Sequence, residues 1–181
     1  MAGADELVQE LDVVLTAFGS RQGASPLKGR EKGDGKGMQN LHAHSVFCDG
    51  KSTPEEMIRA CLAAGMDSAG ISIHSPLPFA NGWAAKAENV APFLHEMRRL
   101  KAKYAGQIAV YAGVEWDVLS DAGWLEPFDY AIGSAHFLPV GDDPEAYPTV
   151  DDSPETTRCF LSEHFDGDSD AAAECYFGQL K

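Results

Sequence analysis

From Met38 onward, short apolar runs alternate with longer segments of helical period. This alternation is typical of βα units, in which each strand is followed by a helix and the strands pair in parallel. The expected strands lie at 39–44, 68–74, 108–115 and 129–135. The expected helices lie at 53–65, 89–104, 120–125 and 169–180. The sequence therefore predicts an α/β fold.

The first of these helices has an explicit start signal. Thr53 can serve as its N-cap, Pro54 suits the first helical position, and Glu56 completes a capping box. The segment 137–168 is different, because its acidic residues far outnumber its single basic residue, Arg158. We expect this segment to be a long, solvated loop.

Residues 1–37 differ in composition from the rest of the chain. The apolar positions of 7–18 fall on one helical face, and the stretch from Gly19 to Gly37 holds six glycines and five basic residues. We therefore predict an amphipathic helix and a flexible linker, followed by a separate domain at 38–181. A docking helix on a tether, a fusion scar and an upstream-start artefact are alternative explanations of 1–37.

Charge and cysteine usage limit the classes of function. The formal net charge is −14, and residues 38–181 hold nine basic and twenty-two acidic side chains. Such an acidic body argues against nucleic acid and anionic membranes as partners and favours a small substrate. The four cysteines lack C-x-x-C spacing, and the chain has neither a long apolar span nor a secretory signal. We expect a cytoplasmic protein and leave its oligomeric state open.

A residue type that can bind a metal stands at the end of every expected strand. His42 and His44 end the first strand, His74 ends the second, Glu115 ends the third, and His136 follows the fourth. The carboxyl ends of parallel barrel strands meet at one rim, where catalytic sites are built. Since side chains alternate along a strand, the two imidazoles of the H-x-H pair also share one face. The sequence thus predicts a metal centre at this rim.

The donor set indicates which metals the centre would take. Asp49 lies in a turn that can fold back over the first strand end and add an oxygen ligand. Mixed imidazole and carboxylate ligation favours two or three Zn²⁺, Mn²⁺ or Fe²⁺ ions over Mg²⁺ or Ca²⁺. Glu115 could bridge two ions, and a metal-bound water could then replace a Ser or Cys nucleophile. A hydrogen-bonded structural role is the alternative for each histidine, and His95 and His164 are expected to be ordinary surface residues.

Four motifs resemble those of the PHP (polymerase and histidinol phosphatase) superfamily. In chain order they are 41–50 (LHAHSVFCDG) with 53–56 (TPEE), 70–79 (GISIHSPLPF), 113–117 (GVEWD) and 128–137 (FDYAIGSAHF). The second and fourth have the form of the histidinol-phosphatase branch. The resemblance covers roughly 38–181, and four ordered motifs are a much more specific indication than any one of them.

The resemblance implies the N-terminal part of a distorted seven-stranded, TIM-like βα barrel with a multinuclear metal site. It implies hydrolysis of L-histidinol phosphate to L-histidinol in histidine biosynthesis, with Glu115 and His136 as the catalytic candidates. The metal-ligand role passes by position to His42, His44, Asp49, His74, Glu115 and His136. Three features depart from the pattern: Ile73 stands where Asp is usual, Asp49-Gly50 follows the broader superfamily, and the last three barrel units are absent. Hydrolysis of another phosphoester such as a nucleotide, and a non-catalytic remnant or binding module, are the alternatives.

Overall fold

The computed structural model describes residues 37–180, which form two compact units. The larger unit consists of 37–116 and 120–132, and the smaller unit consists of 117–119 and 133–180. The predicted N-terminal helix and nearly all of the predicted linker lie outside the described residues.

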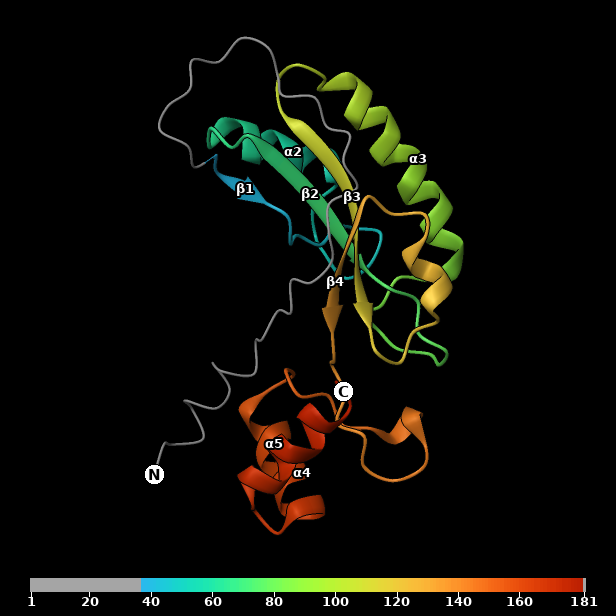
Figure 1. Ribbon diagram of the computed structural model, residues 1–181, viewed down its shortest axis with the longest axis vertical. Helices are drawn as coiled ribbons and strands as arrows, with labels where there is room; N and C mark the ends of the chain where they lie inside the picture. Colours follow the sequence, from blue (N-terminus) through green and yellow to red (C-terminus); the bar gives the residue numbers. More distant parts are fainter. Residues whose placement is uncertain (1–36, 181) are drawn as a thin grey trace. The chain divides into compact units, whose positions relative to one another are not determined.

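The larger unit contains a four-stranded sheet in the order β1-β2-β3-β4 (Figure 1). The strands are β1 (Gln39–Asn40), β2 (Ser68–His74), β3 (Ala109–Asp117) and β4 (Tyr130–Ser134), and the last residues of β3 and β4 belong to the smaller unit. The helices between them are α2 (Pro54–Ala63), α3 (Ala87–Lys103) and the 3₁₀ turn η1 (Ala122–Leu125). β1 with β2, and β2 with β3, pair in parallel, which confirms the predicted α/β class.

The core of the larger unit lies between the sheet and its two long helices. Ile71 and Ile73 of β2 are fully buried, as are Ile58 of α2 and Phe93 and Leu100 of α3. Because side chains alternate along a strand, the intervening residues of β2 face the other side of the sheet. One face therefore carries the apolar core, and the other is left for smaller and polar side chains.

The start of α2 confirms the predicted capping box. The Thr53 hydroxyl accepts a hydrogen bond from the Glu56 backbone N–H at 3.3 Å, and the Glu56 carboxylate accepts one from the Thr53 backbone N–H at 2.8 Å. The neighbouring Glu55 joins α2 to α3, because its carboxylate accepts hydrogen bonds from Arg99 at 2.7 Å, from Tyr104 at 3.1 Å and from Lys103. The packing of these two helices thus has a polar edge as well as an apolar core.

The first strand is shorter than predicted. The ladder covers only Gln39–Asn40, whereas the sequence pattern predicts a strand at 39–44. The backbone N–H of His42 donates to the Asn40 side chain at 3.2 Å, and the carbonyl of Leu41 accepts from the Tyr130 hydroxyl. Side chains therefore form hydrogen bonds with backbone groups that a longer strand would use for pairing.

The smaller unit corrects the predicted loop at 137–168. It contains the 3₁₀ turn η2 (Pro144–Ala146) and the helices α4 (Pro154–Phe165) and α5 (Ser169–Gly178). Ser153 caps α4 by accepting from the Thr156 backbone N–H at 3.1 Å, and the helix ends where Asp166 adopts a positive φ of 51°. Phe160 of α4 is buried and packs with the rest of a small core: Ala135, Leu138, Val150 and Tyr176.

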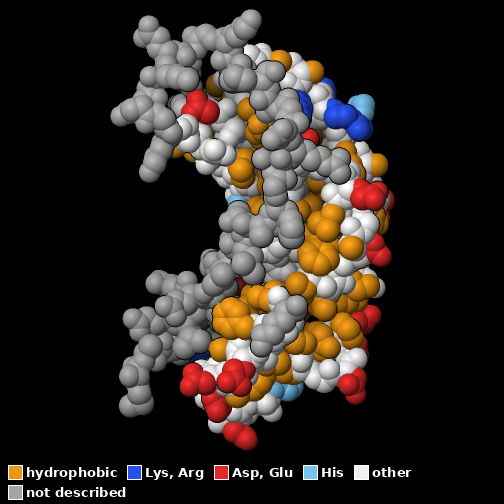
Figure 2. Space-filling view, viewed as in Figure 1, with side chains coloured by type: hydrophobic (Ala, Val, Ile, Leu, Met, Phe, Trp, Pro, Cys, Tyr) orange, Lys and Arg blue, Asp and Glu red, His pale blue; other side chains and the backbone are white. Residues whose placement is uncertain are grey.

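In the larger unit, the Lys and Arg side chains visible in Figure 2 gather over α3, whose last turns carry Arg98, Arg99, Lys101 and Lys103. All four cysteines are free thiols. Across 37–180, no helix combines the length and the apolar character that crossing a bilayer requires.

Candidate metal centre

His74 and Glu115 lie side by side because of the register between β2 and β3. The two residues are paired across the parallel ladder, and Ser75 N–H donates to the Glu115 carbonyl at 2.8 Å just beyond them. Both are buried, with 8% of His74 and 6% of Glu115 exposed. Paired residues of adjacent strands point to the same face, so Nδ1 of His74 lies 3.3 Å from Oε2 of Glu115.

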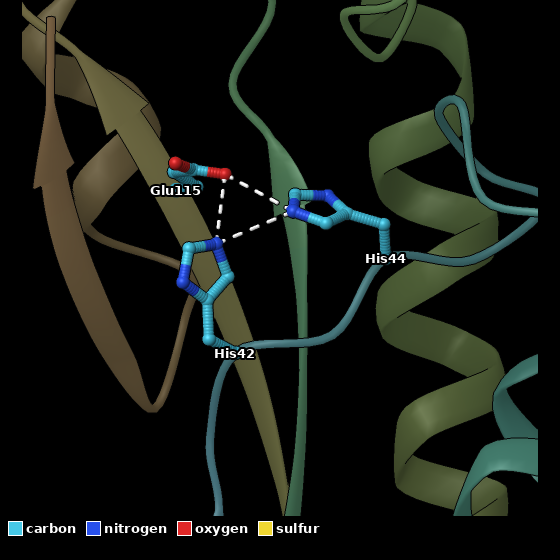
Figure 3. A group of neighbouring side chains, drawn as sticks. All are labelled: His42, His44 and Glu115. Carbon is cyan, nitrogen blue, oxygen red and sulfur yellow. Dashed lines mark hydrogen bonds and ion pairs between the residues drawn. The ribbon is translucent and has the colours of Figure 1, made fainter. Parts of the chain in front are cut away.

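The segment that follows β1 brings two more imidazoles to the same carboxylate. Figure 3 shows His42 and His44 pointing toward Glu115. Their Nε2 atoms lie 3.1 Å and 3.2 Å from Oε2 of Glu115, and the two Nε2 atoms are 3.3 Å apart. Three donor atoms, two from one short segment and one from β3, thus form a nearly equilateral triangle.

The size of this triangle fits a transition-metal ion. Donor atoms that each lie about 2.1 Å from one ion are separated by roughly 3.0 Å in octahedral and 3.4 Å in tetrahedral geometry. The observed separations of 3.1 to 3.3 Å fall within that interval. Two imidazoles and one carboxylate are a donor set suited to Zn²⁺, Mn²⁺ or Fe²⁺.

Asp49 reaches the same region from the turn that follows His44. The backbone N–H groups of Cys48 and Gly50 both donate to the Ser45 carbonyl, and a Cβ on Gly50 would collide with the His44 backbone. This tight turn places Oδ1 of Asp49 3.7 Å from Nδ1 of His44 and 3.7 Å from Nε2 of His74. His44 is therefore shared by two donor groups, one with His42 and Glu115 and one with Asp49 and His74.

The environment of His44 favours a positive charge at this position. Burial of the imidazole lowers its pKa, but hydrogen bonds to Cys48 and Glu115 outweigh that effect and raise the pKa to about 10. The Cys48 sulfur lies 3.6 Å from Nδ1 of His44. The carboxylate and thiol groups around this ring thus favour positive charge beside it.

His136 belongs to the smaller unit, and its ligand role stays a prediction. Oδ2 of Asp117 accepts from the His136 backbone N–H at 3.0 Å and lies 2.9 Å from its Nδ1. A carboxylate bonded to one ring nitrogen fixes the orientation of the imidazole. His95 and His164 are both exposed, as predicted.

The sequence profile of the PHP domain family matches residues 40–181. The chain belongs to the PHP domain family. It is 30% identical over 116 residues to a probable histidinol-phosphatase from Deinococcus radiodurans, covering 56% of this chain and 43% of that protein. It is 29% identical over 115 residues to a histidinol-phosphatase from Bacillus subtilis, covering 54% and 43% of the two chains.

Two further similarities extend the comparison of this PHP chain. The DNA polymerase/3'-5' exonuclease PolX from Bacillus subtilis is 33% identical over 115 residues, covering 60% of this chain and 19% of PolX. A solved structure from Listeria monocytogenes that carries the name histidinol phosphatase superposes with a TM-score of 0.57 at 21% identity, covering 67% and 52% of the two chains. The fold thus corresponds to part of a TIM-like PHP barrel, and this chain spans less than half the length of its curated relatives.

Two residues near the PHP donors are additions to the set predicted from sequence. Trp83 lies edge to face against His74, with ring centroids 4.6 Å apart. Its loop is held by Asn81, whose side chain accepts from the backbone N–H groups of Trp83 and Ala84. Asp117, which orients His136, stands two residues after Glu115. Side chains two residues apart on a strand point to the same face, so this spacing from a predicted ligand could have indicated Asp117.

Proposed function

We propose that this PHP chain carries the metal-binding part of a phosphomonoesterase whose substrate is L-histidinol phosphate. The observation that carries the proposal is the convergence of His42, His44 and Glu115 on one point, with donor separations that suit a divalent ion. The names of the relatives from Deinococcus radiodurans and Bacillus subtilis support the choice of substrate.

The protein's own residues have distinct roles in this proposal. His42, His44, Asp49, His74 and Glu115 would hold the ions, and the buried Glu115 would balance their charge. When bound, divalent ions supply Lewis acidity, which acidifies water and neutralises phosphoryl oxygens. His136, oriented by Asp117, is a candidate for holding an ion or moving a proton at its Nε2.

The loop between β2 and α3 is the proposed substrate-binding segment of the larger unit. It begins at Ser75, whose hydroxyl lies 2.6 Å from the Ser120 hydroxyl, and Ser120 in turn donates to the Pro76 carbonyl at 3.0 Å. These bonds fix the base of the loop beside His74, and the aromatic ring of Trp83 lies edge to face against that imidazole. A small phosphorylated molecule that bound the ions would therefore meet this loop.

The decisive experiment measures phosphate release from L-histidinol phosphate by the full chain loaded with Zn²⁺ or Mn²⁺. We expect hydrolysis by the wild type and a loss of at least about 100-fold when both His42 and His44 are replaced by Ala, since two ligands are removed. The matched control is His95→Ala, which removes an exposed imidazole from α3. Equal turnover by the double variant and the wild type would contradict the proposal.

A second candidate is cleavage of a nucleic-acid phosphoester, which the 33% identity to PolX favours. The same ions would activate water, but the substrate would carry many negative charges. The chain's net charge of −14 opposes such a substrate. Parallel assays with L-histidinol phosphate, a mononucleotide and a single-stranded oligonucleotide separate the two candidates by their relative rates.

A further inference from the structure

Two glycines open a slot on the sheet face that carries the metal donors. Gly70 of β2 and Gly113 of β3 lie on the same face as His74 and Glu115, because each stands an even number of residues before its strand's donor. A Cβ at either glycine would overlap the phenol of Tyr130, the first residue of β4. The absence of side chains at these two positions is therefore what admits the Tyr130 ring against the sheet.

The Tyr130 hydroxyl reaches the backbone that carries the histidine pair. It donates a hydrogen bond to the Leu41 carbonyl at 2.5 Å, one residue before His42. Burial raises the pKa of Tyr130 well above its ordinary value, so the hydroxyl keeps its proton and remains a donor. The contact joins residues 89 positions apart in the sequence.

This contact matters because the ladder of β1 ends at Asn40, before the ligands begin. Beyond it, the segment is held to the sheet by two bonds to successive odd-numbered carbonyls: Tyr130 binds Leu41, and the Ser72 N–H binds Ala43 at 2.9 Å. His42 lies between these two fixed points. Metal ligands must be held to within about 0.5 Å, so loss of one fixed point should loosen the donor triangle.

We propose that Tyr130 is a positioning residue for the metal centre, acting through the Leu41 carbonyl to fix the backbone of His42 and His44. The proposal rests on the proposed function only in requiring that these histidines bind a divalent ion. Gly70 and Gly113 take part by providing the slot, and the phenol's role is separate from that of the donors themselves.

The test compares Zn²⁺ affinity in two variants that each lose one tyrosine hydroxyl. Tyr130→Phe keeps the ring in the slot and removes the bond to Leu41. Tyr104→Phe is the matched control, because its hydroxyl also donates one partly buried hydrogen bond, to Glu55 on the helix side of the core. The metal-free full chains are titrated with Zn²⁺ in competition with a chromogenic chelator. We expect Tyr130→Phe to bind about tenfold more weakly and Tyr104→Phe to bind like the wild type.

Urea unfolding of the same metal-free variants separates positioning from a general loss of stability. A merely structural role would lower the free energy of unfolding in both variants and leave the Zn²⁺ affinity of the folded Tyr130→Phe chain unchanged, which would overturn the proposal. Gly70→Ala is the second variant, because its methyl group displaces the phenol while the hydroxyl is kept. We expect a similar loss of Zn²⁺ affinity, and wild-type affinity in this variant would equally overturn the proposal.

Failure of this proposal and failure of the metal site itself give different results. If His42→Ala weakens Zn²⁺ binding and Tyr130→Phe does not, the metal site stands and the positioning role is rejected. If His42→Ala also binds like the wild type, the histidines are not ligands and both proposals fall.

Discussion

Among individual residues, Glu115 has the central place in the larger unit. Its Oε2 atom lies within 3.3 Å of a ring nitrogen of His42, His44 and His74. Only 6% of the residue is exposed, and an ionised carboxylate at that depth needs compensating positive charge. In the metal-free protein, protonated His44 supplies this charge, and in the loaded protein a divalent ion would do so.

Replacing Glu115 by Gln tests this central role, because the amide keeps the shape and removes the charge. We expect Zn²⁺ affinity, measured by calorimetric titration, to fall by at least about tenfold. Asp49→Asn is the comparison, and its smaller loss follows from the 42% exposure of the Asp49 side chain and its longer contacts of 3.7 Å. Equal losses in the two variants would contradict the central placement of Glu115.

The sequence predicted five candidate donors in the larger unit because each one ends or follows an expected strand, and strand ends are visible in a local pattern. His42, His44, Asp49, His74 and Glu115 do lie together. Tyr130 was not predicted as a supporting residue, because its partner carbonyl is 89 residues away and backbone carbonyls leave no trace in the sequence. Side chains that act on distant backbone are thus the part of a site that local patterns miss.

At the level of the elements, α2 and α3 are joined by a charged contact whose strength depends on pH. Lys103 and Arg99 of α3, through their hydrogen bonds, lower the pKa of Glu55 from 4.5 to about 2. A carboxylate with a lowered pKa in the folded state stabilises the fold above its unfolded pKa. This contribution is complete above about pH 4.5 and is lost as the pH falls through about 2.

Glu55→Gln should therefore lower the free energy of unfolding at pH 7, and the difference from the wild type should shrink below pH 4.5. Urea denaturation at a series of pH values measures this difference. The control is Glu155→Gln, which removes an exposed i,i+3 partner of Arg158 in α4 and should have a smaller effect. A Glu55→Gln difference that is constant from pH 7 to pH 3 would contradict the assignment.

The start of α4 carries a helix start signal in a segment where the sequence predicted a loop. Ser153 and Pro154 repeat the start signal of Thr53 and Pro54, yet the surrounding acidic residues favoured a loop. Acidic residues indicate which surface is exposed to solvent. An N-cap residue indicates where a helix begins, because it accepts hydrogen bonds from the first backbone N–H groups. The cap was the better guide to structure here. For the first strand, the prediction was too long. The sequence pattern predicted a strand at 39–44, but the paired strand ends at Asn40.

Ser153→Ala should destabilise the smaller unit by about 1 kcal/mol, the usual cost of losing an N-cap hydroxyl. The substitution removes the hydrogen bond that the Ser153 hydroxyl accepts from the Thr156 backbone N–H at 3.1 Å. Limited proteolysis should cut α4 faster in this variant, while Zn²⁺ binding by the larger unit serves as the internal control. Unchanged cleavage would show that the cap contributes little.

For the whole molecule, the α/β class and the resemblance to part of a PHP barrel followed from the order of the four motifs, and both are confirmed. The division into two units, each with its own apolar core, was not predicted. Its boundary interrupts β3 and β4 rather than a linker, so no change in composition marks it. Contacts between distant residues, and not local sequence, define such a boundary.

Zn²⁺ binding should stabilise the larger unit by linkage, because the unfolded chain does not assemble the donors. At a free Zn²⁺ concentration of 100 times the dissociation constant, the gain is about 2.7 kcal/mol, which corresponds to a rise in Tm of roughly 5 to 10 °C. Thermal unfolding with Zn²⁺ and with a chelator measures the shift. We expect His42→Ala to lose most of it and His95→Ala to keep it, and an equal shift in both would contradict the site.

His44 is shared by two donor groups of the larger unit, and this limits how the two groups can bind metal ions. Its Nε2 faces His42 and Glu115, and its Nδ1 faces Asp49. A neutral imidazole carries one N–H and only one free lone pair. Only one of the two groups can therefore use His44 as a ligand while that ring keeps a proton, and the tautomer of this side chain decides which one.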